Sequence, residues 1–138
     1  MRDEFYMQLA LHKAWEYQGL TYPNPAVGAV VTLDGNILSI EAHQKAGSSH
    51  AEVLALLSAY ETLSNTSIDF DPNDSHKAHA FLLTLPKDFF SQCTIYVTLE
   101  PCSHEGKTPS CASLLQSLAL SRAVVGIEDP IEGHSGGV

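Results

Sequence analysis

Residues 94–127 read "TIYVTLEPCSHEGKTPSCASLLQSLALSRAVVGI", and this stretch decides the fold. Its first part, "TIYVTLE", is rich in β-branched and aromatic residues and predicts a buried strand. "SCASLLQSLAL" at 110–120 then predicts a helix, and "RAVVGI" at 122–127 predicts a second buried strand. A strand, a helix and a strand in this order form a crossover unit whose strands run parallel, so we expect an α/β protein.

The segments before this unit predict a helix, a hairpin and another helix. An opening helix over 3–17, ended by Gly19, is indicated by a mostly apolar stripe. This stripe consists of Phe5, Leu9, Ala10, Lys13 and Trp15. Two strands follow at about 26–33 and 37–43, joined by Asp34-Gly35, a dipeptide that suits a tight hairpin turn. "SSHAEVLALLSAYETL" at 48–63 predicts the next helix, with a serine as the candidate cap.

Residues 63–92 interrupt this regular order. They mix Asn, Asp, Ser and Pro with one short apolar piece, "AFLL", which is typical of a loop region. We interpret them as an insertion that carries a helical turn or two. His76 and His79 lie there at a spacing that a metal site on a helix would have, but we expect an exposed pair.

Composition limits the class of protein. With 138 residues the chain has the size of one ordinary domain that folds around its own core. Its cysteines are three in number, an odd count that argues against a disulfide framework and for reduced thiols. The amino-terminal sequence lacks an apolar leader, and no apolar run reaches the roughly 18 residues of a membrane span. We therefore expect a cytoplasmic protein with no membrane partner.

The charge balance argues against one kind of partner. Sixteen acidic and seven basic side chains give a net charge of −9, and the basic residues are scattered. Binding a nucleic acid needs several clustered cations, so we expect no nucleic-acid partner. A single phosphate group is not excluded by this argument.

Four residues point to chemistry at a metal ion. His50 and Glu52 open the helix at 48–63, whereas Cys102 and Cys111 lie before and at the start of the helix at 110–120. Two thiolates and one imidazole are ligands that Zn²⁺ prefers, and they leave a fourth position for a water molecule. Glu52 is placed to take a proton from that water and to pass it to a departing amine. The remaining cysteine, Cys93, has no such pattern and is expected to be a small buried side chain.

The order H-A-E, then P-C and a later C, is the pattern of the zinc deaminases. More closely, the chain resembles the deaminase domain of the bifunctional riboflavin-biosynthesis enzymes. The shared stretches are "DEFYMQLAL", "NPAVGAVV", "HAEV", "YVTLEPCSHEGKTP" and "EDP", and only 63–92 lies outside the resemblance. The nine-residue step from Cys102 to Cys111 is its most specific element, because cytidine and tRNA adenosine deaminases use P-C-x2-C instead.

The resemblance implies a fold and a reaction. The fold is one deaminase domain over 1–138 with a three-layer α/β/α, cytidine deaminase-like architecture and helices on both faces of a mixed sheet. His50, Cys102 and Cys111 are implied as zinc ligands, and Glu52 as the catalytic proton shuttle. The implied reaction is the hydrolytic deamination of 2,5-diamino-6-(5-phosphoribosylamino)pyrimidin-4(3H)-one to 5-amino-6-(5-phosphoribosylamino)uracil, a step towards riboflavin.

Substrate contacts are implied in the same way. Asn24, His43 and Lys107 match positions that touch the pyrimidine or its ribose phosphate in this family. Lys107 is also a suitable cation for a phosphate, and Asn24 offers both a donor and an acceptor to a pyrimidine edge. His104 and Glu105 are candidate lining residues of the same pocket.

Two other functions stay open at this point. One is the deamination of another nucleobase or nucleoside, such as cytidine or guanine. The other is a structural zinc site closed by His50, Cys102, His104 and Cys111, which would leave no position for water. We favour the pyrimidine deaminase, because a closed site would give Glu52 no role.

The end of the sequence differs from the family pattern. A deaminase domain of this family would continue after "VVGIEDPIEGHSGGV" with a further helix and strand, so we expect a chain that is shortened at its carboxyl end. The bifunctional enzymes continue further into a reductase domain that uses NADPH, and we expect that cofactor only where such a domain follows. The edge strand left at 122–127 would favour association, and a homo-oligomer is kept as an expectation.

Overall fold

The computed structural model of the chain describes residues 2–16, 27–43, 49–99 and 111–127. Within these ranges the order of elements is α1 (Arg2–Trp15), β1 (Gly28–Leu33), β2 (Asn36–Ala42), α2 (Ala51–Ser64), α3 (Ser75–Thr84), β3 (Cys93–Leu99), α4 (Cys111–Ser117) and β4 (Arg122–Ile127). All the helices and strands predicted outside 63–92 are therefore present. None of the helices in the described ranges combines the length and apolar character needed to cross a bilayer.

The strands form one mixed sheet in the order β2-β1-β3-β4. β1 and β2 make the predicted antiparallel hairpin, and both residues of its turn have positive φ, 51° at Asp34 and 82° at Gly35. Such a pair is favoured in two-residue hairpin turns, because it matches the twist of the strands. β1 also pairs antiparallel with β3, whereas β3 and β4 run parallel, as the crossover unit predicted.

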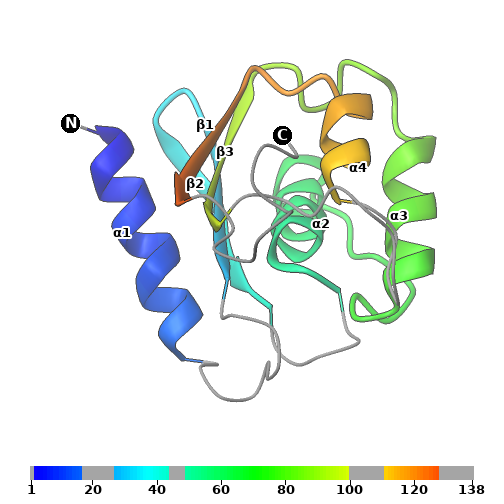
Figure 1. The fold of residues 1–138 in the computed structure, drawn as a ribbon. Coiled ribbons are helices and arrows are strands. Elements are labelled where there is room, and N and C mark those ends of the chain that lie inside the picture. The colour runs from blue at the N-terminus through cyan, green and yellow to red at the C-terminus, as the bar shows by residue number, and fades with distance from the viewer. Residues whose placement is uncertain (1, 17–26, 44–48, 100–110, 128–138) are drawn as a thin grey trace.

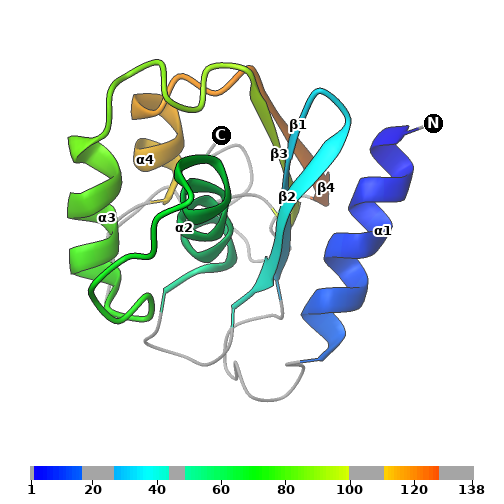
Figure 2. The same ribbon diagram turned by 180° about the vertical axis from the view of Figure 1, so that it is seen from behind.

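Helices cover both faces of the sheet (Figure 1). α1 lies on one face and α2 and α4 lie on the other, with α3 outermost beside α2, and the opposite view in Figure 2 shows the same layers. Side chains alternate accordingly, since Val31 and Ile95 belong to the core under α2 while Val30 and Tyr96 pack under α1. The predicted three-layer α/β/α fold is confirmed.

The apolar stripe predicted for α1 is wrong in part. Phe5 and Trp15 are 56% and 58% exposed, whereas Tyr6, Ala10 and Ala14 are buried. These three are spaced four apart, which places them on one side of a helix. Two of the three are alanines, and the apolar pattern alone does not show that small residues rather than large ones are buried on this helix.

Small residues are needed under α1 because the helix lies very close to β1. A Cβ atom added to Gly28 would lie 1.9 Å from the carbonyl oxygen of Ala10. The Gly28 N–H donates to the hydroxyl oxygen of Thr98 at 3.1 Å, which ties the start of β1 to the end of β3. A larger residue at position 28 would therefore push α1 away from the sheet.

The region predicted as an insertion holds more helix than the expected turn or two. α3 has ten residues and begins at the N-cap Asp74, whose carboxylate accepts the N–H of Lys77. His79 is buried at 6% exposure while His76 is exposed, so the expected exposed pair is wrong for His79. After α3 the chain enters β3 at Cys93, which is buried as predicted, and burial raises the pKa of its thiol.

Candidate active site

The predicted site residues that the structure describes belong to elements that meet at one edge of the sheet. β1 begins where β2 and β3 end, because Gly28 pairs with Ala42 and Ala29 pairs with Val97. β4 runs parallel to β3 and ends at the same edge. The amino ends of α2 and α4 point to this side as well, the lower side in Figure 1. Carboxyl ends of strands beside amino ends of helices are where α/β folds place their sites.

His43 follows β2 and is only 3% exposed. Its Nδ1 lies 3.0 Å from the carbonyl oxygen of Ser49. A carbonyl oxygen can only accept, so Nδ1 carries the hydrogen and Nε2 of the neutral ring presents a lone pair. Nε2 is buried and has no hydrogen-bond partner within the described ranges. This buried acceptor is suited to a donor that binds at the site.

Burial also determines the charge of this ring. It lowers the pKa of His43 below the ordinary histidine value, the hydrogen bond to Ser49 opposes this shift, and the nearby His50 lowers the pKa further. The two imidazoles meet edge to face, with centroids 5.1 Å apart and an interplanar angle of 89°. Burial therefore favours the neutral form of the His43 ring.

His50 is the N-cap of α2, with φ −74° and ψ 163°. Its carbonyl oxygen accepts the N–H of Leu54 at 3.1 Å, while its side chain makes no capping hydrogen bond. The predicted serine cap is therefore wrong, because the hydroxyl of Ser49 donates instead to the carbonyl oxygen of Pro72 at 2.6 Å. This contact was not predictable from a local pattern, since it joins two segments that are 23 residues apart in the chain.

Glu52 lies in the first turn of α2 and is 3% exposed. The amino end of a helix carries a partial positive charge, which stabilises a carboxylate at this position. Its neighbours on the helix, including Ala51 and Val53, are buried apolar residues. Glu52 is thus a carboxyl group shielded from bulk water and close in the chain to His50.

The remaining predicted residues are placed only in part. Cys111 is the first residue of α4, whose amino end points to the same edge of the sheet as the amino end of α2. The other predicted site residues lie outside the described ranges; these are Asn24, Cys102, His104, Glu105 and Lys107. Among the described residues, His43 contacts His50, Glu52 follows His50 in the first turn of α2, and the amino end of α4 points to the same edge of the sheet.

The donor chemistry of these positions fits zinc. Among the side chains that the structure describes, no group of three or more His, Cys, Asp or Glu is arranged to hold a metal ion. One imidazole, at His50, and the helix start at Cys111 nevertheless share the edge where the buried acceptor of His43 lies. Imidazole and thiolate are the usual nitrogen and sulfur ligands of Zn²⁺.

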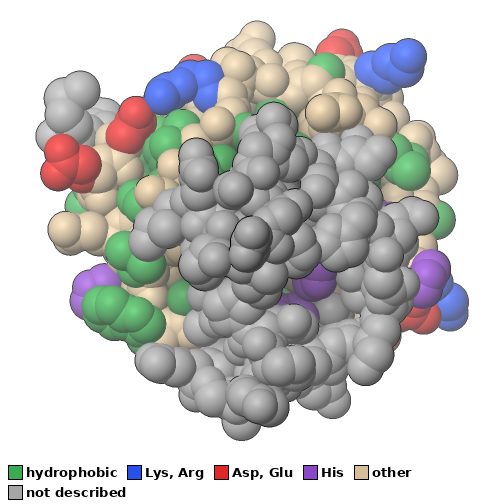
Figure 3. Space-filling model, viewed as in Figure 1, with side chains coloured by type: hydrophobic (Ala, Val, Ile, Leu, Met, Phe, Trp, Pro, Cys, Tyr) green, Lys and Arg blue, Asp and Glu red, His purple; other side chains and the backbone are tan. Residues whose placement is uncertain are grey.

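On the face in Figure 3, charged side chains of both signs among the described residues lie around the outline, and histidine atoms lie near the middle.

A family model described as the cytidine and deoxycytidylate deaminase zinc-binding region matches residues 1–127. The chain belongs to this family. The zinc deaminase resemblance and the cytidine deaminase-like fold are thereby confirmed. The description of the family also names zinc, in agreement with the predicted metal.

Relatives of this chain point to one branch of the family. The riboflavin biosynthesis protein RibD of Aquifex aeolicus is 38% identical over 128 residues, which cover 93% of this chain and 28% of that protein. A diaminohydroxyphosphoribosylamino-pyrimidine deaminase of Buchnera aphidicola (subspecies Acyrthosiphon pisum) is 35% identical over 136 residues, covering 99% of this chain and 74% of the relative. The chain thus spans about a quarter of the first relative and most of the second.

A solved structure shares the fold. It is the diaminohydroxyphosphoribosylaminopyrimidine deaminase/5-amino-6-(5-phosphoribosylamino)uracil reductase of Thermotoga maritima. The TM-score is 0.73 at 32% identity, with 99% of this chain and 32% of that chain covered. Both the sequence and the structure comparison therefore place this chain beside riboflavin-biosynthesis deaminases.

Proposed function

We propose that this chain catalyses the zinc-dependent hydrolytic deamination of 2,5-diamino-6-(5-phosphoribosylamino)pyrimidin-4(3H)-one, giving 5-amino-6-(5-phosphoribosylamino)uracil in riboflavin biosynthesis. One observation carries the proposal: His50 and a buried Glu52 open α2 at the sheet edge where α4 begins with Cys111. The names of the two relatives, a riboflavin biosynthesis protein and a diaminohydroxyphosphoribosylamino-pyrimidine deaminase, support the choice of substrate.

In this proposal His50, Cys102 and Cys111 hold the zinc ion. Zinc, when bound, supplies the Lewis acidity that makes a water molecule reactive near neutral pH. One neutral imidazole and two thiolates balance the charge of the ion, so no further charged ligand is needed. This leaves the nearby carboxylate of Glu52 for proton transfer.

Glu52 acts as base and then as acid. It takes a proton from the attacking water while the new C–O bond forms at the ring carbon that bears the amine. It then gives the proton to the amine nitrogen, the C–N bond breaks, and ammonia leaves. Because Glu52 is 3% exposed, bulk water does not compete for this proton. Water is consumed and ammonia is released, so the step needs no oxidant or reductant.

The substrate is held by residues of opposite hydrogen-bond character. His43 offers a buried acceptor at Nε2, which suits an N–H or O–H group of the substrate. We assign Asn24 to the pyrimidine edge, Lys107 to the phosphate and His104 to the pocket wall. In a protein with a net charge of −9, a dedicated cation is needed to bind a phosphate anion.

The test is a deaminase assay of the purified chain with Glu52→Gln and a matched control. We expect Glu52→Gln to keep its zinc and to lose about 10²- to 10⁴-fold in kcat, the usual contribution of a general acid–base group. Glu4→Gln makes the same chemical change at an exposed position of α1 and should keep full activity. Zinc is quantified in every variant, and unchanged turnover in Glu52→Gln would contradict the proposed mechanism.

The choice of substrate is tested in the same assay. Ammonia release is measured with the diaminopyrimidine phosphate, cytidine and guanine. Activity on cytidine or guanine alone would replace the proposed substrate by another nucleobase. A chain that binds stoichiometric zinc and acts on none of them would support a structural zinc site instead.

A further inference from the structure

Ser49 connects the active site to a segment that the mechanism does not use. Its side chain is fully buried, with 0% exposure. Its hydroxyl donates to the carbonyl oxygen of Pro72 at 2.6 Å, and its own carbonyl oxygen accepts from Nδ1 of His43 at 3.0 Å. Ser49 thus binds Pro72 through its side chain and the His43 ring through its backbone carbonyl group.

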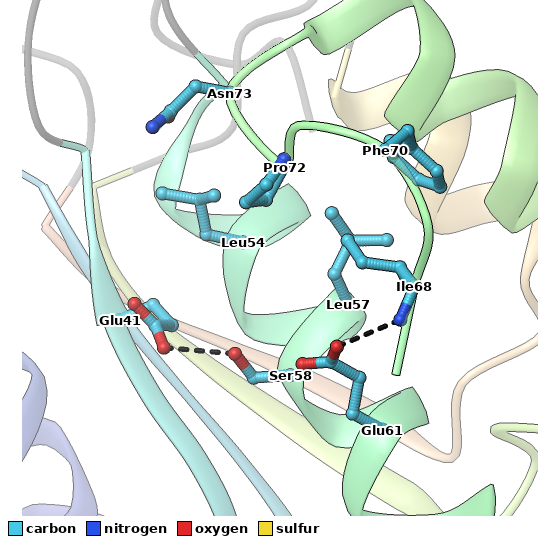
Figure 4. Close-up of a pocket in the computed structure, with 9 residues that line it drawn as sticks. All are labelled: Glu41, Leu54, Leu57, Ser58, Glu61, Ile68, Phe70, Pro72 and Asn73. Carbon is cyan, nitrogen blue, oxygen red and sulfur yellow. Dashed lines mark hydrogen bonds between the residues drawn. The ribbon is translucent and has the colours of Figure 1, made fainter. Parts of the chain in front are cut away.

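Pro72 belongs to the segment 65–74, between α2 and α3. At the start of this segment the N–H of Ile68 donates to Glu61 of α2 at 3.0 Å (Figure 4). Beneath the segment lies a pocket of about 270 Å³, lined by Leu54 and Leu57 of α2 and by Phe70. Packing below the segment is therefore incomplete, and the bond from Ser49 fixes the end that lies next to the site.

We propose that Ser49 is a positioning residue for the deamination, because it anchors to Pro72 and thereby holds the His43 ring with Nε2 as a fixed hydrogen-bond acceptor for the substrate. The proposal rests on the proposed function. It gives the segment 65–74 a role, because the carbonyl group of Pro72 in this segment keeps Ser49 in place beside His43. It also names the group that His43 recognises, an N–H or O–H donor of the substrate rather than its phosphate.

The direction of the hydrogen bond between His43 and Ser49 determines which ring nitrogen is left as the acceptor for the substrate. As long as the Ser49 carbonyl accepts from Nδ1, the neutral ring cannot turn its other N–H towards the site. If the backbone at position 49 moved, the His43 ring could rotate or change tautomer. Nε2 of His43 would then no longer be a fixed hydrogen-bond acceptor. The effect would fall on binding of the substrate, because Glu52 does not depend on this bond.

The experiment compares Ser49→Ala with Ser39→Ala. Ser39 is also buried, and its hydroxyl donates to the carbonyl oxygen of Ala55 at 2.7 Å, a bond that involves neither His43 nor Ser49. Each variant removes one buried hydroxyl-to-carbonyl bond, so we expect both to lower Tm by a similar amount, about 3–6 °C. Only Ser49→Ala should raise KM for the diaminopyrimidine phosphate, by about five- to tenfold, with kcat within about twofold of the native value.

A spectroscopic measurement tests whether Ser49 positions the His43 ring, and it does not need an activity assay. Nitrogen-15 NMR of the His43 ring should show the Nδ1–H tautomer in the native chain and a mixed population in Ser49→Ala, while Ser39→Ala stays native. An Nε2–H tautomer in the native chain would overturn the proposal, as would equal KM values in the two variants. If the native chain deaminates no pyrimidine, the proposed function fails, and the tautomer comparison still decides whether Ser49 positions His43.

Discussion

The two faces of the sheet are held by different kinds of interaction. Under α2 lies a broad apolar cluster to which the sheet, α3 and α4 all contribute. Under α1 the cluster consists of Tyr6, Ala10, Val30 and Tyr96, and directed hydrogen bonds supplement it. The face that carries His50 and Glu52 is therefore the one with the larger apolar core.

Hydrogen bonds connect α1 to the sheet through two of its residues, Asp3 and Tyr6. Tyr96 and Arg122 both donate to the carboxylate of Asp3, at 2.8 Å and 2.9 Å. The hydroxyl of Tyr6 donates to the carbonyl oxygen of Gly35 in the hairpin turn at 2.7 Å. A hydrogen bond contributes about 1 kcal/mol net, less than the burial of one large apolar side chain. Burial of apolar side chains therefore fixes α2, whereas close fit and the direction of hydrogen bonds fix α1.

The largest effect on stability is expected in the core under α2. Leu56 is fully buried, so Leu56→Ala removes apolar contacts and leaves a cavity. We expect a loss of about 2–5 kcal/mol in the free energy of unfolding, measured by urea denaturation. Leu83→Ala is the matched control, because Leu83 on α3 is 56% exposed and should change stability by less than about 0.5 kcal/mol. Equal losses in the two variants would contradict the assignment of the core.

A smaller effect is expected where α1 approaches β1. The Cβ of Gly28→Ala would meet the Ala10 carbonyl oxygen at 1.9 Å, and backbone atoms cannot move aside without shifting the helix. We expect a loss of about 1–3 kcal/mol, from thermal and urea unfolding. At Gly126→Ala the nearest atom is the sulfur of Met7 at 2.9 Å, which belongs to a flexible side chain, so this control should lose clearly less. The reverse order would show that α1 does not lie against Gly28.

The hydroxyl of Tyr96 gives the next prediction. Tyr96→Phe removes the donor to Asp3 and should cost about 1 kcal/mol near pH 7. Burial, with the hydrogen bond to Asp3, raises the pKa of Tyr96 to about 12, above the ordinary value of about 10. Its stabilisation is therefore fully present below pH 10 and is lost as the pH rises towards 12. Urea unfolding at pH 8 and at pH 11.5 should show the difference between native chain and variant shrinking with pH, and a constant difference would argue against the bond.

The smallest effect is expected at the exposed ion pair on the same carboxylate. Arg122 above all, and then Tyr96, lower the pKa of Asp3. The contribution of Asp3 is therefore present above about pH 4 and is lost as the pH falls through its lowered value in the folded protein. Asp3→Asn should lower Tm slightly at pH 7 and not at pH 2, and added salt should reduce the pH 7 difference because the pair is exposed. A large difference that persists at pH 2 would assign Asp3 another role.

The regular parts of this fold were predictable because their signals are local. Asp34-Gly35 predicts the hairpin turn, and the order from "TIYVTLE" to "RAVVGI" predicts the parallel pair of β3 and β4. The prediction for α1 was wrong at Phe5 and Trp15, because the close approach of Ala10 to Gly28 decides which side faces the sheet. That distance is a property of the packed layers and is not encoded in the apolar pattern.

In the candidate site, too, local features were predictable and contacts that depend on packing were not. "HAE" predicts both the start of α2 and the place of Glu52, since all three residues act within one helical turn. The partnership of His43 with Ser49 was not predictable, because it depends on the direction of a backbone carbonyl group. The burial of His79 was missed for a related reason, since α3 packs against α2 only once the whole layer has formed.

The pairing of β1 with β3 determines when the site can form during folding. The hydrogen bond between Gly28 and Thr98 joins positions 70 residues apart, so the centre of the sheet closes over a long loop. Contacts of such separation form slowly, whereas the hairpin and α2 are local and can form early. His50 and Glu52 thus belong to the early half of the chain, and Cys111 to the half that docks last. We therefore expect zinc to bind tightly only after β3, α4 and β4 have docked, which makes metal affinity a measure of completed folding.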